Sequence, residues 1–233
     1  MIVQTMPYPP NTSAGISYVG GAKGFQSSTG SLALNGLTGG IGTSPANGDF
    51  AIVVVSCSSA TAASITSSGW TTLYYAATQD PTAGIRLQIL VAYKALTTAD
   101  TSVGFNNVAM TYAAQVFRGV DNSTPLDVTS VTSIVNDAPQ PNPGSITPVT
   151  AGAWVVACGA SHGAFNANVF TSSDLTNFIS EVNAPTGTDP VVGIGYIPDW
   201  ESGAVNPAQF GGGSTANPTW CSSGQATIAL RPA

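Results

Sequence analysis

Two stretches of the chain repeat one pattern, a glycine turn followed by β-forming residues with a large aromatic near their start. The first is GDFAIVVVS at 48–56 and the second is GAWVVACGA at 152–160. The first run is apolar on both faces, which is typical of a central strand or of a strand covered on its outer side. The pattern therefore predicts two related, buried strands.

Other segments alternate between apolar and polar residues with a period of two, as a strand with one buried face does. In IRLQILVAYKAL, one face carries Ile85, Leu87, Ile89, Val91, Tyr93 and Ala95, and the other carries Arg86, Gln88 and Lys94. This predicts a strand with a mostly wetted second side. QATIALRP places Ala226, Ile228 and Leu230 on one face. No sustained helical period appears, and glycine and proline interrupt the chain at the spacing of strands and turns.

The second half of the sequence follows the first at a nearly constant offset. Gly48 corresponds to Gly152 and Tyr93 to Tyr196, an offset of 103–105 residues that slips only near the end, where Arg118 corresponds to Arg231. Weaker matches relate 15–21 to 128–135 and 31–36 to 144–149. We predict two degenerate half-repeats, at about 15–121 and 128–233, with five or six strands each and a proline-rich connection at 136–144.

A single sheet has no second layer to cover its apolar face, so neither half is expected to fold alone. The sequence predicts an all-β fold, a two-sheet antiparallel β-sandwich of jelly-roll type, in one domain at 15–233. Residues 1–14 precede it as an arm. Only two lysines are available to guard edge strands, so we expect loops or neighbouring subunits to cover the edges.

Composition limits the partners. Charged residues make up 7% of the chain, the net charge is −6, and the five basic residues form no cluster, which argues against nucleic acid and anionic membranes. No apolar run reaches the length of a membrane span. A surface of small polar residues suits a protein outside cells, yet MIVQTMPYPPNTSA lacks the features of an export signal. A virus particle assembled in the host cytoplasm and released by lysis reconciles both observations; an extracellular or cell-surface location is the alternative.

No group of residues specifies a reaction. GASHG at 159–163 fits the nucleophile pattern of hydrolases, but His162, the only histidine, is adjacent to Ser161, so we interpret the segment as a loop after a strand. Asp121 and Asp127 in DNSTPLD could hold calcium, although aspartate is also a common turn residue, and we favour a turn. We therefore expect no enzyme activity, no catalytic residue, no metal site and no cofactor.

For the cysteines, the tryptophans and the two acidic residues beside Trp200, the sequence leaves alternatives open. Cys57, Cys158 and Cys221 are interpreted as three buried thiols rather than as one disulfide with a free thiol or a link between chains. Trp70 and Trp154 are expected in the core, and Trp220 is undecided. In IPDWESG, the candidate glycan contacts are Trp200, Asp199 and Glu201; the alternative is that Trp200 folds back over the end of the sandwich.

Four segments in order, GDFAIVVVS, SGWTTL, YAAQVFRGVDNSTPLD and ATIALRPA, resemble a β-sandwich family of tailed-phage virion proteins and bacterial surface or secreted proteins. The resemblance covers about residues 15–233, and the segment from Arg118 to Asp127 is its most specific part. It implies a jelly-roll-like sandwich used for display or attachment, without a catalytic site to carry over.

These observations together predict a structural protein of a tailed-phage virion, a capsid decoration, head fibre or spike subunit. The arm would dock on other virion proteins, and self-association, with a trimer as one option, would cover the edges. The alternative is a carbohydrate-binding or adhesive module of a phage tail fibre or bacterial surface protein, with a cell-surface glycan as partner. The candidate docking residues are Met1, Ile2, Val3, Met6 and Tyr8.

Overall fold

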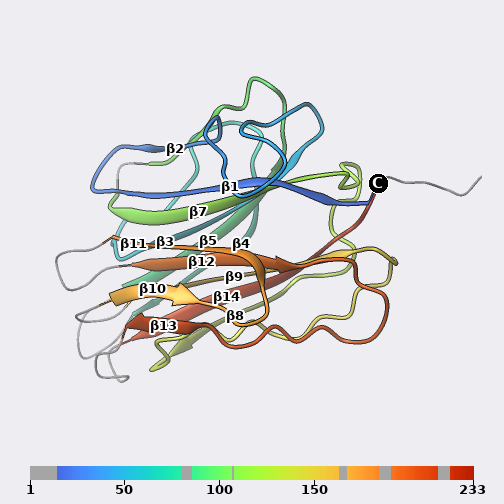
Figure 1. The fold of residues 1–233 in the computed structure, drawn as a ribbon. Coiled ribbons are helices and arrows are strands. Elements are labelled where there is room, and N and C mark those ends of the chain that lie inside the picture. Colours follow the sequence, from blue (N-terminus) through green and yellow to red (C-terminus); the bar gives the residue numbers. More distant parts are fainter. Residues whose placement is uncertain (1–14, 80–85, 107, 163–166, 184–189, 215–220) are drawn as a thin grey trace, which may run out of the picture.

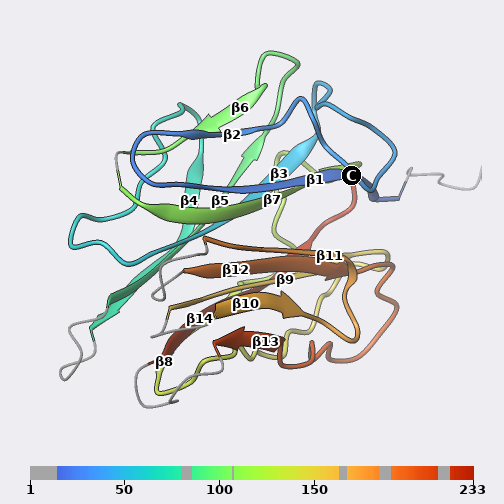
Figure 2. The same cartoon turned by 60° about the vertical axis from the view of Figure 1, so that its left-hand side comes forward.

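The computed structural model describes residues 15–79, 86–106, 108–162, 167–183, 190–214 and 221–233. Every regular element in these residues is a β-strand, because branched and aromatic residues alternate between short glycine and proline turns. The strands form two five-stranded antiparallel sheets, packed face to face, and each sheet carries a two-stranded sheet on its outer side (Figures 1 and 2). The predicted all-β sandwich is confirmed.

The first large sheet, sheet I, has the strand order β1-β7-β3-β5-β4. Its strands are β1 (Ser17–Gln26), β7 (Met110–Arg118), β3 (Phe50–Cys57), β5 (Arg86–Ala95) and β4 (Thr71–Gln79). The second large sheet is sheet II. Starting from its edge strand β8, it has the strand order β8-β14-β9-β12-β11. Its strands are β8 (Val131–Asn136), β14 (Ser222–Leu230), β9 (Trp154–His162), β12 (Val191–Ile197) and β11 (Thr176–Val182).

The two sheets share one strand topology, in agreement with the half-repeats predicted from the sequence. In sheet I, Tyr93 lies opposite Ile52, and in sheet II the corresponding Tyr196 lies opposite Val156. β1 and β8 hold the same edge position, as their weak sequence match indicates. The described chain contains seven strands in each half and not five or six, because the small outer sheets add two per half. Ile146, in the segment matched to 31–36, forms only an isolated bridge.

The core lies between the two sheets and is built from alternate residues of their strands. The alternation predicted for β5 and β14 is confirmed, since Leu87, Ile89 and Val91 meet Ala226, Ile228 and Leu230 there. Ile85 lies outside the described residues. Burial of these side chains is the main force that joins the sheets, because each sheet supplies the apolar surface that the other lacks.

The second side of β5 is buried, whereas the sequence predicted a mostly wetted face. β2 (Ser31–Ala33) and β6 (Ser102–Gly104) form a small sheet over sheet I, and Leu90 and Ala92 pack beneath this layer. Gln88 is only 3% exposed and accepts hydrogen bonds from the Ala63 amide at 2.8 Å and the Tyr75 hydroxyl at 3.0 Å. The polar residue Gln88 in the alternating pattern therefore occupies a buried hydrogen-bonding position and does not face solvent.

A similar layer covers sheet II. β10 (Ala167–Thr171) and β13 (Gly211–Ser214) pair on its outer side, and Phe170, Leu175 and Phe210 fill the space beneath. Both faces of the central strands β3 and β9 are therefore buried along their whole length, as their continuous apolar sequences predicted.

The two flanks of the sandwich differ in how their edge strands are protected. On one flank, Lys23 of β1 lies 3.6 Å from Glu181 of β11, and Thr38 and Gly42 pair with the outer edge of β1 through backbone hydrogen bonds. On the other flank, β4 and β8 lie against each other. Neither contains a charged residue, and among the described residues no further strand pairs with either edge. Within the described part of the chain, loops thus cover one flank, as expected, and leave the other uncovered.

Candidate functional site: the arm end of the sandwich

One end of the sandwich receives the chain at Gly15, and we call it the arm end; it lies on the right-hand side of Figure 1. Strands β1, β3 and β9 begin there, and β5, β7, β12 and β14 end there. The Ala233 amide donates to the Gly119 carbonyl at 2.9 Å, next to the pairing of Ser17 with Arg118. The first and last described residues therefore lie at the same end.

Asp49 and Arg118 brace this end of sheet I. The Asp49 carboxylate is 1% exposed and accepts hydrogen bonds from Nε and Nη2 of Arg118 at 2.8 and 3.0 Å. Gly48, which precedes it, has a φ of 85°, a conformation that favours glycine over residues with a Cβ. The G-D pair of the sequence thus provides a turn and a buried anion that fixes the end of β7.

The segment from Arg118 to Asp127 forms a clamp on the last strand. The Asp121 amide donates to the Arg231 carbonyl, the Arg231 amide donates to the Pro125 carbonyl, and the Asp127 amide donates to the Ala229 carbonyl. The two segments that carried much of the family resemblance are therefore hydrogen-bonded to each other. Nothing in the sequence alone indicated this pairing.

Asp121 and Asp127 act within that clamp. Asp121 accepts hydrogen bonds from the Ser123 and Thr124 amides at 2.9 and 3.2 Å, and these bonds and that of the Thr124 hydroxyl lower its pKa. Burial raises the pKa of Asp127, but hydrogen bonds from Thr150, Val149 and Arg231 outweigh burial and leave the pKa lowered. The Asp121 carboxylate thus forms a turn, as we favoured, whereas the Asp127 carboxylate bonds the distant residues Val149, Thr150 and Arg231.

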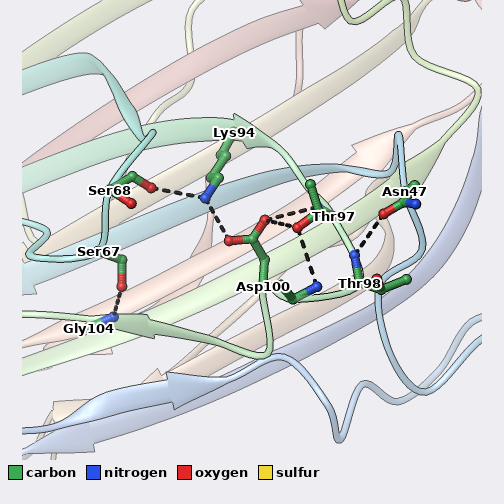
Figure 3. Close-up of polar contacts among 9 residues, drawn as sticks. Asn47, Ser67, Ser68, Lys94, Thr97, Thr98, Asp100 and Gly104 are labelled. Carbon is green, nitrogen blue, oxygen red and sulfur yellow. Dashed lines mark hydrogen bonds and ion pairs between the residues drawn. The ribbon is translucent and has the colours of Figure 1, made fainter.

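Lys94 and Asp100 connect two loops of sheet I at the same end (Figure 3). Lys94 Nζ lies 2.6 Å from Asp100 Oδ1 and donates to the Ser68 carbonyl at 2.9 Å. Burial raises the pKa of Asp100, but hydrogen bonds from Lys94 and Thr97 outweigh it and lower the pKa. The turn before Trp70 and the loop after β5 are therefore held together by one ion pair, to which the sequence analysis gave no role.

Aromatic side chains fill the interior behind this end. The rings of Trp154 and Tyr196 stack at 4.5 Å, and Phe117 packs edge-on against Trp154 at 6.0 Å. Burial raises the pKa of the neighbouring Tyr18 to about 12. Trp154 is a core residue, as predicted, whereas Trp70 is only partly buried, against the outer cluster of sheet I.

The arm end also gathers much of the scarce charge. Three of the five basic residues and seven of the eleven acidic residues lie in its loops and strand ends. The basic residues are all in ion pairs with Asp49, Asp100 and Asp127. The acidic residues outside these pairs are Asp121, Asp174, Asp199 and Glu201. The arm end therefore carries a net negative charge.

The candidate glycan contacts also lie at the arm end. The Trp200 backbone pairs with Gly152 and Ala153, just before β9, and its partly buried indole donates Nε1–H to the Gly203 carbonyl at 2.8 Å. Asp199 has a φ of 52° and accepts the indole N–H of Trp154 at 3.2 Å. Glu201 is exposed. The three residues are neighbours, but two of them already have partners within the fold.

The docking residues Met1, Ile2, Val3, Met6 and Tyr8, and also Trp220, lie outside the described residues.

Ser161 and His162 lie inside strand β9 and are buried, so the predicted loop at 159–163 is wrong for these positions. Adjacent residues of a strand point to opposite faces, and the two side chains therefore do not face each other. Within the described ranges, His, Cys, Asp and Glu side chains form no group of three that could hold a metal ion. The structure also contains no helix, in those ranges, long and apolar enough to cross a membrane.

The three cysteines are buried thiols, as we favoured over a disulfide. Burial raises the pKa of Cys57 and raises that of Cys158 to about 12. Because the thiolate is the reactive form, these positions are expected to be inert in the folded protein.

Comparisons of the chain with protein-family models, curated proteins and solved structures return no match.

Proposed function

We propose that this chain is a structural protein of a tailed-phage virion, a capsid decoration, head fibre or spike subunit. It docks on other virion proteins through residues 1–14 and displays the sandwich. The observation that carries the proposal is that β1, the first described strand, begins at one end of a sandwich whose two sheets pack face to face. A body attached at this end presents its opposite end away from the attachment point.

The arm end suits attachment because its loops are held in place. The pairs Asp49–Arg118 and Asp127–Arg231 connect segments that are far apart in the sequence. Lys94, paired with Asp100, also donates to the Ser68 carbonyl of the turn before Trp70. A preorganised surface loses less conformational entropy on binding than a mobile one. Assembly on the particle in the host cytoplasm, followed by release on lysis, agrees with a low-charge surface and with three reduced, buried cysteines.

Self-association completes the proposal. The flank formed by β4 and β8 presents uncharged edge strands, the kind of edge that pairs with another chain unless it is blocked. Association of subunits through this flank, with a trimer as one option, would pair these edges and leave the arm ends free to dock.

The test is incorporation of arm variants into particles. Deleting residues 1–14 should abolish incorporation, while circular dichroism and gel filtration still report a folded sandwich. The double variant Val3→Asp with Met6→Asp should also reduce incorporation into particles. Asn11→Asp with Thr12→Asp, which adds the same charge to the same arm outside the docking residues, should be incorporated normally. Incorporation of the truncated chain would contradict the proposal.

A carbohydrate-binding or adhesive module is the second candidate, with Trp200, Asp199 and Glu201 as glycan contacts. These residues lie at the arm end, so docking through the arm would turn them toward the particle. These three residues could contact a glycan only if the protein were attached through a surface other than the arm end. Binding of the wild-type chain to a glycan array, lost in Trp200→Ala, would favour this candidate over arm-mediated display.

A further inference from the structure

We propose that the outer face of sheet II carries a binding groove for an uncharged sugar. The groove has a volume of about 400 Å³, within the range of roughly 300 to 1,000 Å³ that small-molecule sites occupy. It lies along β8 and β14, beneath the segment that connects the half-repeats. Its polar lining consists of Ser133, Gln140, Asn142, Gln209, Ser223 and Gln225.

The lining selects the chemistry of the ligand. It offers amides and hydroxyls but no charged side chain, so an anion or a cation would lose its hydration without gaining a counter-charge. Amide side chains both donate and accept hydrogen bonds, and the hydroxyl groups of a sugar do the same. Val135, which is 42% exposed, adds an apolar contact for the C–H face of a sugar ring.

Gln225 shows that the groove has unused hydrogen-bonding capacity. Its side chain is 3% exposed, and its Nε2 donates to Ser133 Oγ. Its Oε1 is buried without a partner among the described residues. Buried polar atoms nearly always have a partner in proteins, so an acceptor left open in a groove indicates a donor supplied by a ligand.

The duplication provides an internal comparison. In sheet I, Tyr112 lies opposite Val55 and stacks on Phe105 at 4.7 Å. The corresponding pair in sheet II is Gln225 opposite Gly159. The same outer-face position thus holds stacked aromatic rings in one half and an amide side chain in the other. The two half-repeats thus differ in chemistry at the position where the groove lies.

Gly159 also shapes the groove wall. A Cβ at this position would lie 2.5 Å from the Cβ of Pro141, so only glycine allows the connecting segment to approach β9 so closely. That approach places Gln140 and Asn142 beside β14, where the Gln140 carbonyl accepts a hydrogen bond from Ser223 Oγ at 3.5 Å.

The test is an array of uncharged oligosaccharides of hexoses and N-acetylhexosamines, with sialylated and sulfated glycans as charged probes. The wild-type chain should bind at least one uncharged glycan and none of the charged ones. Asn142→Ala with Gln209→Ala, at two exposed positions of the groove, should weaken this binding by at least about tenfold, or about 1.4 kcal/mol. Asn35→Ala, an exposed amide on the covering layer of sheet I, is the matched control and should bind normally.

Gln225→Met keeps the shape of the buried side chain and removes its amide, and it should also abolish binding. Gln115→Met is its control, since Gln115 is equally buried but lies outside the groove; thermal unfolding of both variants separates loss of binding from loss of fold. Absence of binding to every uncharged glycan, or binding unchanged in the groove variants, would overturn the inference. The groove does not involve the arm, so particle incorporation and sugar binding fail or succeed separately.

Discussion

Asp49 and Arg118, 69 residues apart in the sequence, form a two-bond ion pair in which the carboxylate is buried and the guanidinium is half exposed. The pair joins the second residue of GDFAIVVVS to the first residue of the segment from Arg118 to Asp127. It explains why a chain with so few charges keeps these two, since Asp49 would otherwise be a buried anion without a charged partner.

Removing the Arg118 guanidinium should therefore destabilise the sandwich. We expect Arg118→Ala to lower the free energy of unfolding by about 2 kcal/mol, the range for hydrogen bonds to a charged group. Arg118→Lys, which keeps the charge but not the planar pair of donors, should fall between wild type and Arg118→Ala. Denaturant titration measures both. An unchanged unfolding midpoint in Arg118→Ala would show that the pair contributes nothing.

Acid should weaken the clamp on the last strand. The pKa of Asp127 is lowered from its ordinary value of 3.8 in the folded protein, so the stabilisation is fully present above that value. It is lost as the pH falls through the folded pKa, because the unfolded chain then binds the proton more readily. We expect the free energy of unfolding to decrease below about pH 4.

Asp127→Asn is the control for this effect. The variant should be less stable than wild type near neutral pH, and the difference should shrink as the pH falls. Unfolding curves measured across the acid range test this, and parallel profiles for the two proteins would contradict it.

The cysteines should react only after unfolding. All three are buried, and the raised pKa values of Cys57 and Cys158 leave little thiolate at neutral pH. Alkylation with iodoacetamide, followed by mass spectrometry, should label these two positions only in denaturant, in step with the unfolding transition. Rapid labelling of the native protein, or a disulfide-linked dimer on a non-reducing gel, would be inconsistent with their burial.

A charge on the uncovered flank should prevent self-association. Ala77 is an exposed residue of β4, and a lysine there would place a charge on the edge, as protected edge strands do. We expect Ala77→Lys to be monomeric where the wild type forms oligomers, as measured by analytical ultracentrifugation. Ala33→Lys, an exposed alanine of β2, should assemble like the wild type. Equal assembly of both variants would exclude this flank as the interface.

The sequence predicted the architecture well because the relevant signals are local. Continuous apolar runs indicated β3 and β9, alternation indicated β5 and β14, and the constant offset indicated that two related sheets share one core. It failed where burial depended on distant segments. Gln88 was expected in water, but β2, β6 and the loop before Trp70 cover that face.

The site was less predictable, because its contacts join positions far apart in the chain. The sequence singled out Asp199, Trp200 and Glu201 as neighbours, but it could not show that they share an end with Gly15. It also missed the groove around Gln225. Comparison of the half-repeats position by position, with Tyr112 against Gln225, would have shown the polar substitution, although not the cavity beside it.

The meeting of Gly15 and Ala233 at one end has a practical consequence for work with this protein. An affinity tag that follows Ala233 will sit beside the surface that the arm is proposed to use. Immobilising the protein through such a tag on a sensor chip would hide that surface and expose the opposite one. Capture experiments should therefore be paired with an untagged chain in solution.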